Sequence, residues 1–155
     1  MYRGFTLIEL VMSLAMIAIL AAAALPMAEL VVQRNHERDL RKALNEIREA
    51  LDMFKRASDD GRIPRAVGAS GYPANLNLLV NGVKDAKDPR GRFIYFLRRL
   101  PRDPMEPNAD IPAEQTWGIR SYSTSSSEPK FVDDVYDVYS LSPKTGLNGL
   151  AYREW

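Results

Sequence analysis

The pattern of apolar and charged positions begins with an uninterrupted apolar segment. From Leu10 to Ala28 the sequence LVMSLAMIAILAAAALPMA contains no charged side chain, and a helix of this length can cross a hydrocarbon layer of about 30 Å. The run predicts a transmembrane helix over residues 5–29. A cleaved secretory signal is the alternative, because residues 21–24 are alanines that imitate a cleavage site. The absence of a break before the charged segment that follows favours the uncleaved helix.

A second apolar pattern follows and has a helical period. Its members recur in steps of four and three residues and are Leu40, Leu44, Ile47, Leu51 and Phe54. Such a face predicts an amphipathic helix over residues 30–58 that covers a globular domain. The opposite face is predicted to be solvated and carries Arg38, Arg41, Lys42, Arg48, Glu49 and Lys55. A coiled coil is the competing interpretation, but the repeat is short.

The pattern of residues 59–155 predicts a globular domain that contains both helical and strand segments. The residues from Ser58 to Gly61 end the long helix, and a loop rich in Pro and Gly follows. A short helix is predicted over residues 74–81, with Leu76, Leu79 and Val80 inward and Gly82 at its end. Core residues are expected at Phe93, Tyr95, Phe96, Leu97 and Leu100, before a rigid turn at residues 101–104.

Two later stretches, residues 116–122 and 134–141, alternate as strands do. The loop between them, residues 123–129, is predicted to be mobile. The fold class is therefore α+β: a long N-terminal helix, half membrane-embedded and half amphipathic, packed on a small antiparallel sheet with a short second helix and long loops.

Composition and charge narrow the possible functions. The chain has 155 residues, 21 Lys and Arg against 20 Asp and Glu, and no Cys. A net charge of +1 does not indicate a nucleic-acid partner. The densest basic patch, at Arg98, Arg99 and Arg102, is predicted to be ordinary surface. His36, the single histidine, has no nucleophile beside it, so no catalytic site is predicted.

The first residues, MYRG followed by FTLIEL, resemble the class III signal of type IV pilins and pseudopilins. The resemblance implies a leader of residues 1–4 that a prepilin peptidase removes after Gly4. The same enzyme would then methylate the new N-terminus at Phe5. A glycine suits this junction, because its backbone can lie extended in a protease cleft without a side-chain clash. The pilin-like signature continues through Thr6 to Glu9.

Glu9 is the acidic residue of this signature. A carboxylate at the edge of an apolar helix is costly unless it is paired, and such residues are usually functional. The resemblance implies that Glu9 pairs with the N-terminal amine of Phe5 in a neighbouring subunit during assembly. The alternative is a glutamate that reaches water at the membrane edge.

Pro26 removes a backbone hydrogen bond from the predicted helix, so a kink or local loosening is expected there. By resemblance, melting at Pro26 would let filament subunits lengthen and repack. A proline simply tolerated in a membrane helix is the other interpretation.

Parts of the globular domain also resemble G-type, major pseudopilins. They are the turn from Asp60 to Pro64, the L-P-x-D-P element at residues 100–104, and the end of the chain from Ser140. In that family the last loop frequently binds calcium, which needs several hard oxygens. Residues 140–152 offer Asn148 and no Asp or Glu, so no metal or other cofactor is expected. Asp133, Asp134 and Asp137 are predicted to be surface or turn acids, and Trp155 a packing residue.

The resemblance implies a structural subunit of a type II secretion pseudopilus, not an enzyme. Its expected partners are copies of itself, minor pseudopilins, prepilin peptidase, the inner-membrane secretion platform and, before assembly, membrane lipid. Two alternatives stay open: a type IV pilus pilin for adhesion, motility or DNA uptake, and a single-pass membrane-anchored binding module that never polymerises.

The expected location is the bacterial inner membrane, with the globular domain in the periplasm. Positive charges predict the reverse orientation, because Arg34, Arg38, Arg41 and Lys42 follow the span while Arg3 precedes it. The orientation that the leader implies is preferred.

Overall fold

The computed structural model describes residue 4, residues 6–122 and residues 134–155, with the side chains of residues 23–26 outside this description. The chain divides into two compact units, Met1–His36 and Glu37–Trp155. We call them the N-terminal and the C-terminal unit. One helix, α1 (Leu7–Asp59), supplies backbone to both. The predicted mobile loop at residues 123–129, and Asp133, lie outside the described residues.

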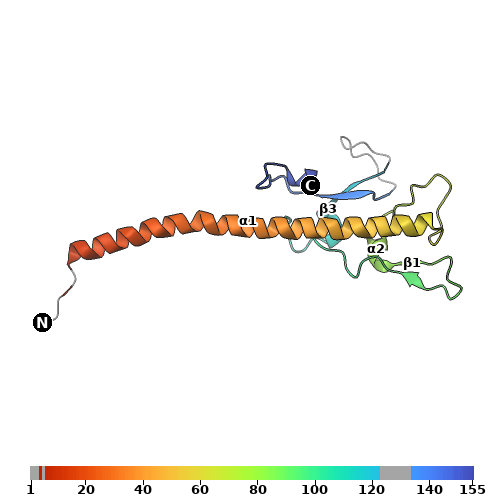
Figure 1. Ribbon diagram of the computed structural model, residues 1–155, viewed down its shortest axis with the longest axis horizontal. Helices are drawn as coiled ribbons and strands as arrows, with labels where there is room; N and C mark the ends of the chain where they lie inside the picture. The colour runs from red at the N-terminus through yellow and green to blue at the C-terminus, as the bar shows by residue number, and fades with distance from the viewer. Residues whose placement is uncertain (1–3, 5, 123–133) are drawn as a thin grey trace. The chain divides into compact units, whose positions relative to one another are not determined.

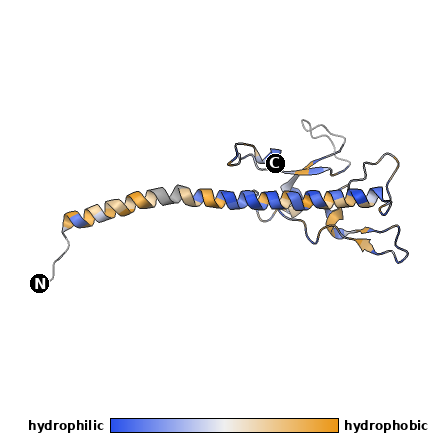
Figure 2. Cartoon of the chain, viewed as in Figure 1, coloured by the Kyte–Doolittle hydropathy of each residue, from blue (hydrophilic) through white to orange (hydrophobic). Residues whose placement is uncertain are grey.

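The hydropathy of α1 changes along its length, as Figure 2 shows. Its N-terminal part is hydrophobic and its side chains are exposed, whereas its C-terminal part is mostly hydrophilic with buried apolar positions. Among the described residues, α1 is the one helix long and apolar enough to cross a membrane. The sequence-based prediction of a long helix that is first apolar and then amphipathic is confirmed.

The C-terminal end of α1 is closed by a Schellman motif. Gly61 has a φ of 68°, a conformation in which a side chain would be strained. The amide of Gly61 donates to the carbonyl of Ser58, and the amide of Arg62 donates to that of Ala57, both at 2.9 Å. These two bonds satisfy carbonyls that the helix end leaves unpaired. The predicted stop at residues 58–61 is therefore confirmed.

Within the described residues the strands form two small antiparallel sheets. In one, β1 (Val83–Lys84) pairs with β2 (Phe93–Ile94), and in the other, β3 (Trp117–Arg120) pairs with β4 (Asp137–Ser140). The register of the second sheet places Gly118 opposite Tyr139. Two short 3-10 helices, η1 (Ala113–Thr116) and η2 (Tyr152–Glu154), flank it in sequence. Figure 1 shows these elements along the C-terminal part of α1.

The core of the C-terminal unit forms on the predicted face of α1. All five of its apolar residues are buried, together with Trp117, Val135, Val138 and Tyr152 from the later elements. The short helix α2 (Asn77–Asn81) contributes Leu79, and its carbonyl accepts the amides of Phe96 and Leu97 at 3.0 and 2.9 Å. The α+β class is confirmed.

Some local predictions were wrong. Phe93 and Tyr95 were expected in the core but are 55% and 65% exposed, because the β1–β2 hairpin turns them outward. Leu97 is buried, and Phe96 and Leu100 pack on the core. The predicted short helix begins three residues late, at Asn77, and Gly82 ends it with a φ of 77°. The second predicted strand pairs only from Asp137, where the register with β3 begins.

Candidate functional site

The first turn of α1 carries the predicted assembly residue. Glu9 lies in this turn, and its Oε2 accepts the backbone amide of Thr6 at 3.5 Å and the Thr6 hydroxyl at 3.4 Å. In return the amide of Glu9 donates to Thr6 Oγ1 at 3.4 Å. This reciprocal pattern is a capping box, which satisfies amides that a helix start leaves free. Thr6, which the sequence indicated only as part of the signature, thus also caps the helix, and the pattern Thr-x-x-Glu indicates this cap.

Behind this turn the apolar side chains of α1 contact little of their own chain. Leu7 is 83% exposed, Ile8 69% and Leu20 70%, and exposure above 40% continues through Leu30, Val31 and Val32. Apolar surface of this extent is unfavourable in water at about 25 cal/mol per Å². It therefore indicates a lipid or protein partner.

The predicted processing and kink positions stand as follows. Gly4 is exposed, and a Cβ added there would meet no atom within 4 Å. Phe5 lies outside the described residues. The backbone of α1 is helical at Pro26, and the kink there stays a prediction, as do the cleavage at Gly4 and the pairing of Glu9 with Phe5.

A second polar site lies at the start of the C-terminal unit. Glu37 is 5% exposed, and its Oε1 accepts the amide of Leu147 at 2.8 Å and the hydroxyl of Tyr152 at 3.1 Å. A buried carboxylate is stable only when hydrogen bonds or charges compensate it. Glu37 therefore connects α1 to the end of the chain. The sequence contains no signal for this role, because Glu37 lies among other charged residues.

A cluster of charged residues reinforces the same connection. The carboxylate of Asp137 on β4 accepts Arg48 Nε from α1 at 2.7 Å on Oδ1 and Arg120 Nη1 from β3 at 2.7 Å on Oδ2. The side chains of Arg48, Arg120 and Asp137 are 35%, 29% and 19% exposed. We call these three residues the arginine cluster. It joins α1 to β3 and β4, which lie far from it in sequence.

The cluster overturns two predictions. Arg48 was assigned to the solvated face of α1 but is half-buried, whereas Arg41 of the same face is exposed, with its guanidinium 4.4 Å from the ring centroid of Trp155. Asp137 was predicted to be a surface acid and is instead paired. The prediction that Trp155 packs is confirmed, since its ring also meets Tyr152 at 5.1 Å.

Two further acids are buried in the C-terminal unit. Burial raises the pKa of Asp103, although hydrogen bonds from Ser140 Oγ and the amide of Met105 partly oppose that effect. Asp134, predicted as a surface acid, is 8% exposed. Burial works against its ionisation, but hydrogen bonds from Ser121, Ser70 and the amide of Tyr122 outweigh it, and the pKa of Asp134 is lowered. Hydrogen bonds to the charged form have this effect generally.

The residues of the last loop do not fit a calcium ion. Calcium takes about 6–8 oxygen ligands and prefers carboxylates. Two of the loop's side-chain oxygens already accept hydrogen bonds: Asn148 Oδ1 accepts the amide of Leu150 at 3.1 Å, and Ser142 Oγ accepts that of Lys144 at 3.4 Å. Across the described residues, no three His, Cys, Asp or Glu side chains are grouped so that they could hold a metal.

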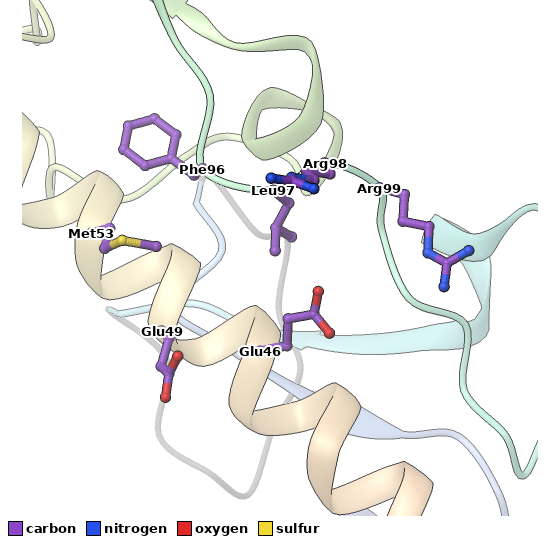
Figure 3. Close-up of a pocket in the computed structure, with 7 residues that line it drawn as sticks. All are labelled: Glu46, Glu49, Met53, Phe96, Leu97, Arg98 and Arg99. Carbon is purple, nitrogen blue, oxygen red and sulfur yellow. The ribbon is translucent and has the colours of Figure 1, made fainter.

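The predicted basic patch is divided in the structure. Arg102 donates to the carbonyls of Asn108 and Ile111. Arg98 and Arg99 instead line a pocket beside α1, and of the two acids of α1 that also line it, Glu46 points toward the arginines and Glu49 away from them (Figure 3). The other residues that line this pocket are Glu46, Glu49, Met53, Phe96 and Leu97. The three arginines therefore present no continuous basic surface.

Comparison with known proteins agrees with the N-terminal geometry. The family model of the prokaryotic N-terminal methylation motif matches residues 1–25. The chain is 32% identical over 105 residues to "Type II secretion system core protein G" of Aeromonas hydrophila, which covers 65% of this chain and 66% of the relative. The match thus spans slightly less than two thirds of the relative's length. No solved structure matches the chain.

The motif, the exposed apolar helix and the α+β unit behind it are features that the chain shares with type IV pilin-like proteins, a class of structural subunits. Within this class its similarity is to the core protein G of type II secretion systems. The resemblance to pseudopilins seen in the sequence is confirmed.

Proposed function

We propose that the chain is a subunit of a type II secretion pseudopilus, cleaved after Gly4 and polymerised to drive protein export. The observation that carries this proposal is the combination of the methylation motif over residues 1–25 with a carboxylate at Glu9 and an unpartnered apolar helix behind it. The similarity to a secretion core protein favours a pseudopilus over an adhesive or motile pilus.

Assembly would satisfy both features of the N-terminal unit at once. In lipid the apolar side chains from Leu7 to Val32 are solvated, but the carboxylate of Glu9 stays costly without a cationic partner. A neighbouring subunit can supply both more apolar surface and the amine of Phe5. The Thr6 contacts of Glu9 are long, at 3.4 and 3.5 Å, which suits a carboxylate that exchanges its partner on assembly.

The expected location follows from this role. The apolar part of α1 would span the inner membrane before assembly, and the C-terminal unit would lie in the periplasm. The expected partners are copies of the chain, minor pseudopilins, prepilin peptidase and the inner-membrane secretion platform. A fusion of a periplasm-dependent reporter to the C-terminus tests the orientation, since the positive charges after the span predict the opposite side.

Sheared-filament assays test the assembly role of Glu9. The full chain is produced with a prepilin peptidase and the secretion platform, and Glu9→Ala is compared with Glu29→Ala, an exposed glutamate of the same helix. We expect Glu9→Ala to be inserted and processed but absent from filaments, whereas Glu29→Ala assembles. Equal assembly of the two variants would refute the proposal.

A further variant separates charge pairing from helix capping. Thr6→Ala removes the reciprocal hydrogen bond to the amide of Glu9 but keeps the carboxylate. Loss of a cap costs about 1 kcal/mol, so we expect Thr6→Ala to assemble. If Thr6→Ala fails as completely as Glu9→Ala, capping and not charge is the function of Glu9.

Cleavage is tested independently by mass spectrometry of the purified chain. The expected mature N-terminus is a methylated Phe5, and Gly4→Leu should leave the leader uncut because a side chain then occupies the cleft. A native product that begins at Met1, or after the alanine tract, would exclude the pilin-like route.

A further inference from the structure

We propose that the arginine cluster holds residues 145–155 on the C-terminal unit without a bound calcium ion. This inference concerns the folding of the unit and does not depend on polymerisation. In a loop that binds calcium, the metal ion supplies the positive charge that holds the loop. In this unit we assign that role to the guanidiniums of Arg48 and Arg120.

The two guanidiniums together contact the same kinds of oxygen that calcium would. Each oxygen of the Asp137 carboxylate receives one arginine at 2.7 Å. Arg48 Nη2 also donates to the backbone oxygen of Trp155 at 2.6 Å, and Arg120 Nη2 donates to the carbonyl of Arg153 at 2.7 Å. A carboxylate and backbone oxygens are typical calcium ligands, and here cationic donors already use them.

The connections join four separate parts of the unit. Arg48 comes from α1, Arg120 from β3 and Asp137 from β4, and the backbone oxygens belong to the last three residues. Charge-assisted hydrogen bonds of this kind are roughly twice as strong as neutral ones. Partial burial, with side-chain exposures of 35%, 29% and 19%, limits their screening by water and salt. The cluster can therefore determine the position of the chain end.

Aromatic rings contact Arg120 of the cluster and a further arginine of α1, Arg41. The guanidinium of Arg120 lies 4.7 Å from the ring centroid of Tyr139. That of Arg41 lies 4.4 Å from the centroid of Trp155. The guanidiniums of Arg48 and Arg120 both contact the Asp137 carboxylate, so a divalent cation there would meet repulsion as well as occupied ligands.

The segment also closes its own turn without a metal. The amide of Gly146 donates to the carbonyl of Leu150 at 2.8 Å, and that of Gly149 donates to the carbonyl of Gly146 at 2.9 Å. Thr145 and Ala151 form a β-bridge. The backbone groups that a calcium ion would organise are thus satisfied by one another.

Hydrogen exchange of the full chain in detergent micelles tests the proposal. Exchange of residues 145–155 is followed by mass spectrometry in calcium chloride and in EGTA. We expect the two wild-type exchange curves to coincide. Arg48→Met and Arg120→Met keep the aliphatic stem and remove the charge, and each should speed exchange of this segment roughly tenfold, which corresponds to about 1.4 kcal/mol. Calcium should not restore the protection.

Matched variants complete the design. Arg98→Met removes an exposed arginine and should leave the segment protected. Arg48→Lys keeps the positive charge but loses the planar guanidinium that donates several hydrogen bonds at once, so an intermediate exchange rate is expected. This variant also tests the proposal if Arg48→Met does not fold. Faster exchange of the wild-type chain in EGTA, or unchanged exchange in both methionine variants, would overturn the proposal.

Discussion

Replacing Glu37 by leucine should destabilise the C-terminal unit more than any other change of a single acid on α1. The residue is 5% exposed, and its Oε1 accepts hydrogen bonds from the Leu147 amide and the Tyr152 hydroxyl. Leucine fills a similar volume but accepts neither bond. Tyr152 is itself only 2% exposed, so water cannot easily replace the lost acceptor at its hydroxyl.

The magnitude follows from these two donors. A buried donor left unsatisfied costs about 1–3 kcal/mol, and the gain from burying an apolar leucine returns about 1.5–3 kcal/mol at most. For Glu37→Leu we expect a net loss of about 2 kcal/mol, since hydrogen bonds to a charged acceptor lie at the upper end of their range. In a chain of 155 residues this lowers Tm by roughly 4–8 °C.

Urea and thermal unfolding of the full chain in detergent, followed by tryptophan fluorescence, measures the effect. Glu37→Gln keeps an acceptor oxygen and should lose about half as much free energy. Glu49→Leu, at an exposed position of α1, is the matched control and should change the free energy of unfolding by less than about 0.5 kcal/mol.

A double-mutant cycle then isolates the contact with Tyr152. Tyr152→Phe removes only the hydroxyl, and its cost should largely disappear in the Glu37→Leu background, with a coupling energy of about 1 kcal/mol. If Glu37→Leu is as stable as Glu49→Leu, or if the two substitutions are additive, the assigned role of Glu37 is wrong.

Two further predictions concern the β3–β4 sheet and its neighbours. A Cβ at Gly118 would lie 2.3 Å from Cζ of Tyr139, so Gly118→Ala should lose about 1–3 kcal/mol in urea unfolding; Tyr139→Leu should relieve that loss, and an additive double variant would contradict the clash. Burial raises the pKa of Asp103, so its contribution to stability is greatest below the unfolded pKa and declines as pH rises through the folded pKa. Asp103→Asn should therefore gain stability relative to wild type between acid and neutral pH, and a pH-independent difference in unfolding free energy would count against it.

The sequence by itself determined the N-terminal half of this protein. The uncharged run from Leu10 to Ala28 and the four-and-three spacing of the apolar residues that follow are local patterns, because a helix satisfies its own backbone hydrogen bonds within one turn. The end of α1 could be predicted for the same reason: the turn at Gly61 depends on residues a few positions away. The signature around Gly4 and Glu9 is also contiguous, so it could be found without a fold.

Only the tertiary structure decided the roles of Glu37, Arg48 and Asp137. In the sequence they lie among other charged residues, and no local pattern distinguishes Glu37 from Glu49. The contacts of Glu37 and of Arg48 join positions about a hundred residues apart along the chain, and contacts of that kind appear only when α1, β4 and the last loop meet. The same holds for Phe93 in β2 and Tyr95 just after it: their apolar character predicted burial, but the pairing of β2 with β1 sets the direction in which these side chains point.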